Sequence, residues 1–225
     1  MVFRPALFWG IMAGRITALE VQKKNKNRVN VYLDGEFAFG LPLMEAVRLH
    51  KGQWLTDEDI DRLKAADAYS RAMEAATRFL AVRPRSVAEV RRRLQRSHFD
   101  AATIERVIER LRELEYLDDE AFARYWVENR ETFRPRGLRA LRYELRQKGI
   151  SNEIIERVLG TVEPTVSARA ALLPKARRWK QLQWPEFRTK ATQYLARRGF
   201  SYDVIRDTVV EVWQEVQGTL PDVND

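Results

Sequence analysis

The sequence predicts a mainly α-helical protein in which three tandem three-helix repeats form an elongated crescent, preceded by a small N-terminal β-hairpin or meander unit. Three observations predict this fold class. Strand-like alternation of apolar residues occurs only over residues 15–41. Helical periodicity with capping residues fills the rest of the chain. The capping residues recur at intervals of about fifty residues, which is typical of a stacked helical repeat.

These signals divide the 225 residues into seven predicted segments. They are a flexible or misassigned N-terminal extension (1–14), a small β unit (15–41), a helical connector (42–66), three helical repeats (67–115, 116–165 and 166–217) and a tail (218–225). The extension has an apolar stretch after Arg4 that loosely resembles a short secretory signal. Because only one charge precedes that stretch, a misassigned start or a loose extension is the better interpretation.

The β unit is predicted to contain a tight hairpin. Ile16–Gln22 and Val29–Leu33 have strand-like composition, and the apolar residues of the second segment share one face at period two. Asp34-Gly35 follows directly and is typical of a type I′ turn, because both central residues of that turn take positive φ. The first loop, Lys23–Arg28, holds four bases that either form a solvated turn or contact phosphate.

The helical part is predicted from its caps and from their recurrence. Thr56 begins the first long helix, followed by carboxylates that suit the positive end of the helix dipole. The step Arg83–Ser86 (Arg-Pro-Arg-Ser) recurs 51 residues later as Arg134–Gly137 (Arg-Pro-Arg-Gly). Gly149 and Gly199 occupy the same helix-ending position in the second and third copies. A gapless match of this kind indicates three copies of one structural unit.

Composition and motifs exclude several classes of protein. There is no cysteine, so disulfides and thiolate chemistry are excluded, and no apolar run reaches the ~18 residues that a membrane span needs. The sequence has no glycine-rich phosphate loop, G-x-S-x-G or H-E-x-x-H motif. We therefore expect no catalytic residues, no metal site and no cofactor.

Two groups of titratable residues have the chemistry of a site, and a structural role is the favoured interpretation of both. Asp118, Asp119 and Glu120 could hold a metal, but acids at the start of a helix are explained by capping and by the helix dipole. His50 precedes Lys51-Gly52 and is most simply a helix-end residue, and His98 takes the position that glycine takes in the later repeats. An enzyme that acts on nucleic acid through a metal at the acidic cluster is the weakest alternative.

The charge of the chain is segregated. The formal net charge is +8 and the pI is near 9.9, which favours a polyanionic partner or an acidic protein surface. Residues 169–198 hold nine bases and one acid, whereas residues 105–131 hold nine acids and five bases. Trp179, Trp184 and Tyr194 are interleaved with the bases of the first segment; core packing is the favoured role for them, and base stacking is the alternative.

We expect basic side chains on the helical repeats to carry the contact with a partner. A solvated helix face with internal ion pairs is the alternative for any single arginine. The predicted contact residues are Arg91, Arg92, Arg139, Arg142, Arg146, Lys148, Arg177, Arg178, Lys180, Lys190, Arg197 and Arg198.

These motifs resemble the bacterial RecX family, regulators of the RecA recombinase. The resemblance lies in the two Arg-Pro-Arg steps, in the Leu-x-x-x-Gly-Ile helix ends and, most specifically, in Tyr116–Ala123 (Tyr-Leu-Asp-Asp-Glu-Ala-Phe-Ala). Ile16–Leu41 looks like the N-terminal extension of longer members, so the resemblance covers roughly residues 15–217. The third repeat departs from the pattern, with Trp184-Pro185-Glu186 in place of the Arg-Pro-Arg step.

The resemblance implies a non-enzymatic, cytoplasmic modulator, most simply a monomer, that acts in homologous recombination, DNA repair and the SOS response. Its partners would be the RecA filament and DNA, either single-stranded or within the filament, and no membrane. It would bind in the filament groove and inhibit strand exchange and ATP hydrolysis by RecA. A stand-alone DNA-binding module that contacts phosphates is the alternative, and it would bind with a steep salt dependence.

Overall fold

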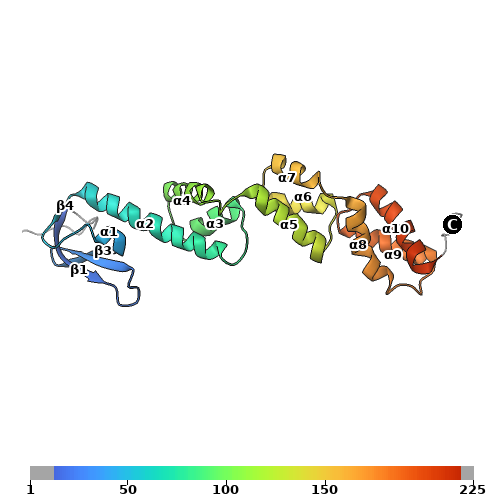
Figure 1. The fold of residues 1–225 in the computed structure, drawn as a ribbon, viewed down its shortest axis with the longest axis horizontal. Coiled ribbons are helices and arrows are strands. Elements are labelled where there is room, and N and C mark those ends of the chain that lie inside the picture. Colours follow the sequence, from blue (N-terminus) through green and yellow to red (C-terminus); the bar gives the residue numbers. More distant parts are fainter. Residues whose placement is uncertain (1–12, 219–225) are drawn as a thin grey trace, which may run out of the picture. The chain divides into compact units, whose positions relative to one another are not determined.

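The computed structural model describes residues 13–218, which fold into a small sheet followed by helices (Figure 1). The predicted extension and tail lie outside the described residues except for their innermost positions. The first part of the chain contains β1 (Gly14–Val21), β2 (Arg28–Leu33), β3 (Glu36–Pro42), α1 (Leu43–Ala46), β4 (Trp54–Leu55) and α2 (Asp57–Leu80). The rest contains α3 (Val87–Arg96), α4 (Ala101–Glu113), α5 (Asp119–Phe133), α6 (Leu138–Gln147), α7 (Asn152–Leu159), α8 (Pro164–Ala176), α9 (Trp184–Arg197) and α10 (Tyr202–Gln217).

The chain divides into two packing units, and the division falls inside α3. One unit holds the residues up to Val82 together with Arg91–Glu113. The other holds Arg83–Val90 together with the chain from Leu114 onward. Each unit is described by itself below.

The antiparallel sheet has the strand order β3-β2-β1-β4, and the predicted hairpin is confirmed. Val29, Val31 and Leu33 are all buried on one face of β2, as their period-two spacing predicts. Asp34 and Gly35 have φ of 48° and 93°, the left-handed values that the type I′ turn requires.

The fourth strand was not predicted. β4 lies in the segment expected to be a helical connector and pairs with the start of β1, where Gly14 is opposite Leu55 and Arg15 is opposite Trp54. A turn at Gly52, with φ of 89°, brings the chain back to the sheet. A two-residue strand is too short to show alternation in sequence, which explains why it was missed.

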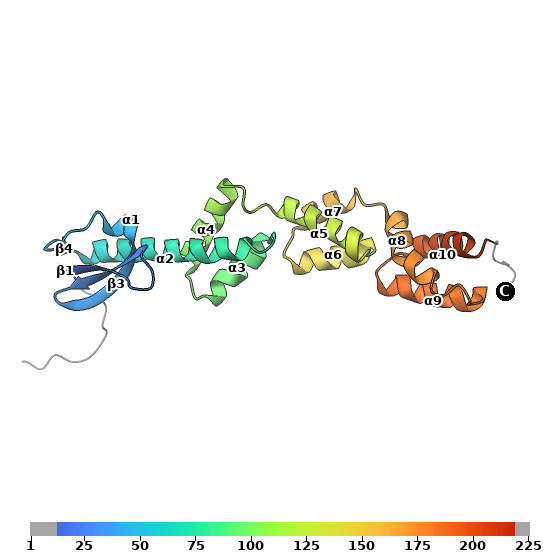
Figure 2. The same ribbon diagram turned by 60° about the horizontal axis from the view of Figure 1, so that its bottom comes forward.

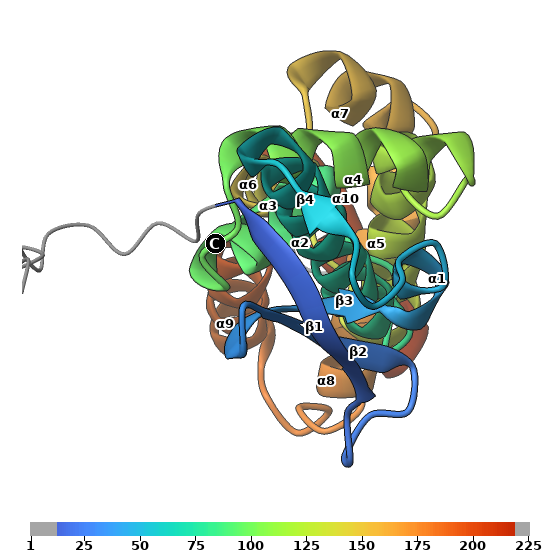
Figure 3. The ribbon, with the colours of Figure 1, turned by 90° about the vertical axis from the view of Figure 1, so that its left-hand side faces the viewer.

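The core of the N-terminal unit lies between the sheet and α2. Figure 3 shows the strands lying across that helix, and Ile16, Leu41, Leu55 and Ile60 are at most 1% exposed. α2 begins as predicted. The Thr56 hydroxyl accepts a hydrogen bond from the Asp59 N–H at 3.1 Å, and the Asp59 carboxylate accepts one from the Thr56 N–H, which completes a capping box.

This cap gives a direct stability prediction. Thr56→Ala removes the side-chain acceptor and is expected to lower the free energy of unfolding by about 1 kcal/mol. Ser201→Ala is the matched control because Ser201 is also an N-cap residue but makes no side-chain capping bond. Urea denaturation of the full chain measures both variants. Equal losses in the two variants would show that the Thr56 hydroxyl does not stabilise the helix.

The three predicted helical repeats are confirmed. The first is formed by the end of α2 with α3 and α4, the second by α5–α7, and the third by α8–α10, whose grouping Figure 2 shows. Positions that correspond between the repeats share the same burial and backbone conformation. They are Leu94, Leu145 and Leu195, each 0% exposed; Ile104, Ile155 and Ile205, each at most 4% exposed; and His98, Gly149 and Gly199, whose φ values are 60°, 80° and 84°.

Candidate functional site

Two predicted contact arginines form ion pairs inside their own repeats. Arg142 donates two hydrogen bonds of 2.7 Å to the Glu156 carboxylate, and Arg91 donates two of 2.8 Å to Glu105, at corresponding positions of the first and second repeats. The bond from Arg142 lowers the pKa of the Glu156 carboxyl, and that from Arg91 lowers the pKa of Glu105. These pairs join the second helix of each repeat to its third, so their charges are balanced locally.

Two other predicted contact residues are engaged at joints between helical segments. The Lys148 ammonium lies 2.9 Å from Glu89 and 4.6 Å from the centre of the Trp126 ring. The Arg198 guanidinium donates to the Pro135 carbonyl at 3.0 Å. Because these side chains are bound within the fold, they have little reach toward a partner.

The Arg-Pro-Arg step, at Arg83–Ser86 and again at Arg134–Gly137, forms both of these contacts between one repeat and the next, which we call the first and second joints. In the first joint, the Ser86 hydroxyl donates to the Lys148 carbonyl at 2.6 Å. In the second, the Gly137 N–H donates to the Arg198 carbonyl at 3.0 Å. Ser86 and Gly137 both end an Arg-Pro-Arg step, and the two acceptors both precede a helix-ending glycine. The sequence predicted only that the Arg-Pro-Arg step ends one helix and begins the next. In the structure, the residue that ends the step also binds the end of a helix in the following repeat.

The Glu89 carboxylate is the charged centre of the first joint. It accepts hydrogen bonds from Arg83 at 2.9 Å and from Lys148 at 2.9 Å, and it closes a capping box with Ser86. Burial of the carboxyl opposes its ionisation, but the bonds from Arg83 and Lys148 outweigh burial and lower the pKa of Glu89 to about 2.

The lowered pKa predicts a pH-dependent joint. A carboxyl whose pKa lies below its ordinary value of 4.5 stabilises the fold above about pH 4.5, and this contribution is lost as the pH falls toward 2. Glu89→Gln is expected to destabilise the protein by about 1–2 kcal/mol at pH 7, a figure reduced for partial solvent screening, and by much less at pH 3.

Urea denaturation at several pH values tests this prediction. Glu153→Gln is the control because Glu153 pairs with Arg157 but is 81% exposed, so it should change stability by no more than about 0.5 kcal/mol. A Glu89→Gln destabilisation that does not change with pH would contradict the role assigned to the ionised carboxylate.

The remaining predicted residues are concentrated in the third repeat. Within residues 13–218, no ion pair forms at the exposed side chains of Arg139, Arg177, Arg178, Lys180, Arg188 and Arg197. Arg188 was not among the predicted contact residues; it corresponds to buried Val87 of the first repeat and is exposed on α9. Lys190 is also exposed and lies 5.0 Å from the centre of the Trp179 ring. We name the cations of the third repeat, Arg177, Arg178, Lys180, Arg188, Lys190 and Arg197, the repeat-3 cations.

Two further predicted residues lie outside this set. Arg146 is exposed on α6 and donates to the Asn152 side chain at 3.0 Å. Arg92 is exposed on α3 beside Arg91.

The surface around α9 combines these charges with polar side chains. Two clefts of about 420 and 590 Å³ flank the helix, and Thr189 and Gln193 line both. Arg188 lines one cleft, and Lys190 lines the other together with the acid Glu186. Cations together with hydroxyl and amide donors suit phosphate oxygens or carboxylates.

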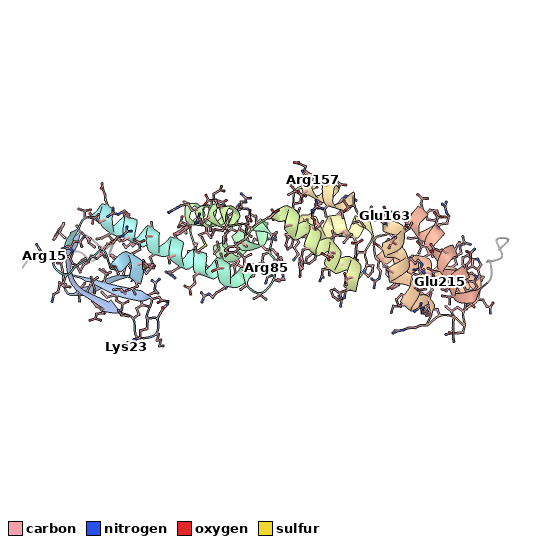
Figure 4. All side chains as sticks on the ribbon, in the orientation of Figure 1. Arg15, Lys23, Arg85, Arg157, Glu163 and Glu215 are labelled. Atoms are coloured by element: carbon pink, nitrogen blue, oxygen red, sulfur yellow. The ribbon has the colours of Figure 1, made fainter. Side chains whose placement is uncertain are left out.

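The third helix of the same repeat has the opposite charge. Four acids at four-residue spacing form one row along α10: Asp203, Asp207, Glu211 and Glu215. Arg169 lies 2.6 Å from Glu215 and 3.3 Å from Glu211, so its charge is compensated within the repeat. Figure 4 shows Glu215 on this helix. Asp207 is likewise paired with Arg206 at 2.8 Å, so most of this acidic row is compensated within the repeat.

The interleaved aromatic residues serve packing. Trp179 makes edge contacts with Phe187 and Tyr194, with ring centres 6.4 and 6.0 Å apart, and Trp184 makes one with Trp213 at 5.4 Å. These rings contact the core of the third repeat. Their arrangement supports the packing interpretation over base stacking.

Asp118 of the acidic cluster caps α5, as predicted. Asp118 accepts hydrogen bonds from the N–H groups of Glu120 and Ala121 at 2.7 and 3.1 Å. Glu120 pairs with Arg124 and with Arg157, which Figure 4 labels on α7. Among the described residues, no three His, Cys, Asp or Glu side chains are grouped closely enough to hold a metal ion. None of the helices in the described part of the chain is both long and apolar enough to cross a bilayer.

Four family models match the chain, one over the N-terminal sheet and one over each helical repeat. The Regulatory protein RecX N-terminal domain matches residues 14–56, and the first, second and third RecX three-helix domains match residues 72–111, 118–159 and 167–209. The chain belongs to the RecX family. The first of these RecX domains covers the sheet, including β4, and the other three cover the helical repeats.

Curated RecX relatives match over most of their length. The Regulatory protein RecX of Clostridium botulinum (strain Eklund 17B / Type B) is 31% identical over 88% of this chain and 95% of its own. The protein of the same name from Bacillus subtilis (strain 168) is 33% identical over 89% of this chain and 78% of its own.

Solved RecX structures have the same fold. A structure described as "Crystal structure of regulatory protein RecX" matches with a TM-score of 0.66 and 30% identity, over 86% of this chain and 99% of the other. The structure of RecX from Lactobacillus salivarius matches with a TM-score of 0.60 and 26% identity, over 67% of this chain and 99% of the other. Family membership therefore assigns a regulatory role.

Proposed function

We propose that this RecX family member is a non-enzymatic modulator of RecA that binds the groove of the RecA–DNA filament and inhibits recombinase activity and ATP hydrolysis. It acts as a cytoplasmic monomer whose partners are the RecA filament and the DNA within it. The observation that carries the proposal is the set of exposed repeat-3 cations, for which the described residues supply no ion pair. An uncompensated excess of like charge raises the free energy of the folded state unless an anionic partner binds it.

Several of the predicted contact residues are already bound to groups of the protein itself, which leaves fewer cations for a partner. Arg91 and Arg142 are bound to their own carboxylates, and Lys148 and Arg198 hold the joints, so we assign these four side chains a structural role. The repeat-3 cations are the main contact, with Arg139, Arg146 and Arg92 in secondary positions. The filament repeats along its axis, so a chain of helical repeats can contact several protomers and gain avidity from many weak contacts.

A second candidate, a stand-alone DNA-binding module, is favoured by the same unpaired cations, because phosphates would neutralise them equally well. Titration of labelled single-stranded DNA at two salt concentrations, with and without RecA, separates the two functions. The RecA modulator is expected to bind weakly to DNA alone and tightly to the filament. Tight binding without RecA, with a salt slope of about −0.7 per phosphate contact, would favour the second candidate and contradict the first.

A further inference from the structure

The loop between β1 and β2 carries a second concentration of positive charge, far from the repeat-3 cations in sequence. Lys23, Lys24 and Lys26 are exposed, and no described residue forms an ion pair with any of them. Figure 4 shows Lys23 at the outer end of this hairpin, directed away from the sheet. We call residues 22–28 the lysine loop. The proposed function does not use this loop.

The lysine loop is fixed at both of its ends. The Gln22 N–H donates to the Arg28 carbonyl at 2.9 Å, and the Leu43 N–H donates to the Asn27 carbonyl at 2.8 Å. Inside the loop, the Asn25 side chain accepts from the Asn27 N–H at 3.0 Å. A loop that is already ordered loses little conformational entropy when it binds a ligand.

An ion pair ties the base of the loop to α2. The Arg28 guanidinium lies 2.7 Å from the Asp67 carboxylate, and the two side chains are 19% and 13% exposed. This pair removes Arg28 from the four bases that were considered for a phosphate contact. It also occupies the carboxylate at the base of the loop, so the three lysines remain uncompensated.

We propose that the lysine loop is a nucleic-acid contact in its own right, at which Lys23, Lys24 and Lys26 bind the phosphate backbone. A lysine ammonium is a compact point charge with three donors, and it can neutralise single phosphate oxygens of a nucleic-acid backbone. The exposed bases of the loop are all lysines, and its asparagines add amide donors. A two-stranded hairpin is also narrow enough to enter a DNA groove. This contact lies in the N-terminal unit and does not depend on RecA.

The salt dependence of DNA binding by the full chain, without RecA, tests the proposal. Each lost phosphate contact reduces the slope of log K against log [salt] by about 0.9 on duplex DNA and about 0.7 on single strands. Replacing the three lysines by glutamine is therefore expected to reduce the magnitude of the slope by about 2–3. The matched control is Arg48→Gln with Lys51→Gln and Lys64→Gln, which removes the same charge from the same unit and should change the slope by less than about 1.

A positional measurement complements the slopes. Because the chain has no cysteine, Lys24→Cys carries a single photo-crosslinker, and Lys51→Cys is its control. We expect DNA to crosslink at position 24 and at most weakly at position 51. Equal crosslinking at the two positions, equal slopes for the two triple variants, or no DNA binding by the wild-type chain would each overturn the proposal.

Polyglutamate tests the alternative that the lysine loop binds an acidic protein surface and not nucleic acid. If the triple loop variant lost affinity for polyglutamate while its DNA binding stayed unchanged, the loop would contact acidic protein and the proposal would be wrong. Inhibition of RecA is measured separately, so failure of this proposal is distinguishable from failure of the proposed function.

Discussion

Gly137→Ala is expected to break the joint between the second and third repeats and to cost about 2–4 kcal/mol of stability. A Cβ at this position would lie 2.1 Å from the carbonyl oxygen of Gly199 and 2.4 Å from the amide nitrogen of Phe200. Both atoms belong to the backbone, so no side-chain rotation relieves the overlap. The φ of Gly137 is −72°, which any residue can adopt, so the requirement for glycine is one of space alone.

Urea denaturation followed by tryptophan fluorescence measures this loss. Gly160→Ala is the matched control because Gly160 has helical backbone angles, φ −62° and ψ −15°, and a change within about 1 kcal/mol is expected there. Limited proteolysis detects loss of the joint even where the variant stays folded. Without the joint, the backbone of the Arg-Pro-Arg-Gly step is exposed, so faster cleavage there is expected. If the two variants were equally stable and equally resistant to proteolysis, the claim that the contact at Gly137 holds the two repeats together would be wrong.

Reversing Arg177, Arg178 and Lys180 to glutamate is expected to weaken binding to RecA–DNA filaments by about tenfold to a hundredfold. Exposed charge pairs contribute about 0.2–1 kcal/mol each, and reversal replaces three attractions by three repulsions. Tenfold in affinity corresponds to about 1.4 kcal/mol. The effect should shrink as salt is added, because exposed charges are screened.

Co-sedimentation of the chain with preformed filaments measures this affinity, and circular dichroism verifies that the fold is kept. The control is reversal of Arg48, Lys51 and Lys64, which makes the same change of net charge in the N-terminal unit. If both triple variants lose affinity equally, net charge and not the repeat-3 surface determines binding.

Local features of the fold were predictable from sequence because each depends on a few neighbouring residues. The turn at Asp34-Gly35 and the cap at Thr56 are set by the conformations and hydrogen bonds of short segments. The three repeats were predictable because the helix-ending positions recur at intervals of about fifty residues. β4 was missed because its pairing with β1 is set by tertiary structure and not by its own two residues.

The contact residues could be predicted only in part, because partners distant in sequence decide which cations are free. Arg142 meets Glu156 fourteen residues away, and Lys148 meets Glu89 fifty-nine residues away. Composition indicates that residues 169–198 are basic, but it does not show that the charge of Arg169 is neutralised by an ion pair with Glu215 of α10. The offset between each Arg-Pro-Arg step and the glycine that ends the corresponding helix of the next repeat differs by only one residue between the two copies, and it was the available signal for the joints.

The rate of ATP hydrolysis by RecA on single-stranded DNA, measured with increasing amounts of the full chain, tests the proposed function most directly. We predict that the rate falls with added wild-type chain and that the Arg177, Arg178 and Lys180 reversal needs at least about tenfold more protein for the same inhibition. A hydrolysis rate that stays constant at wild-type concentrations that saturate the filament, or equal inhibition by the reversed variant, would contradict a filament contact made by the repeat-3 cations.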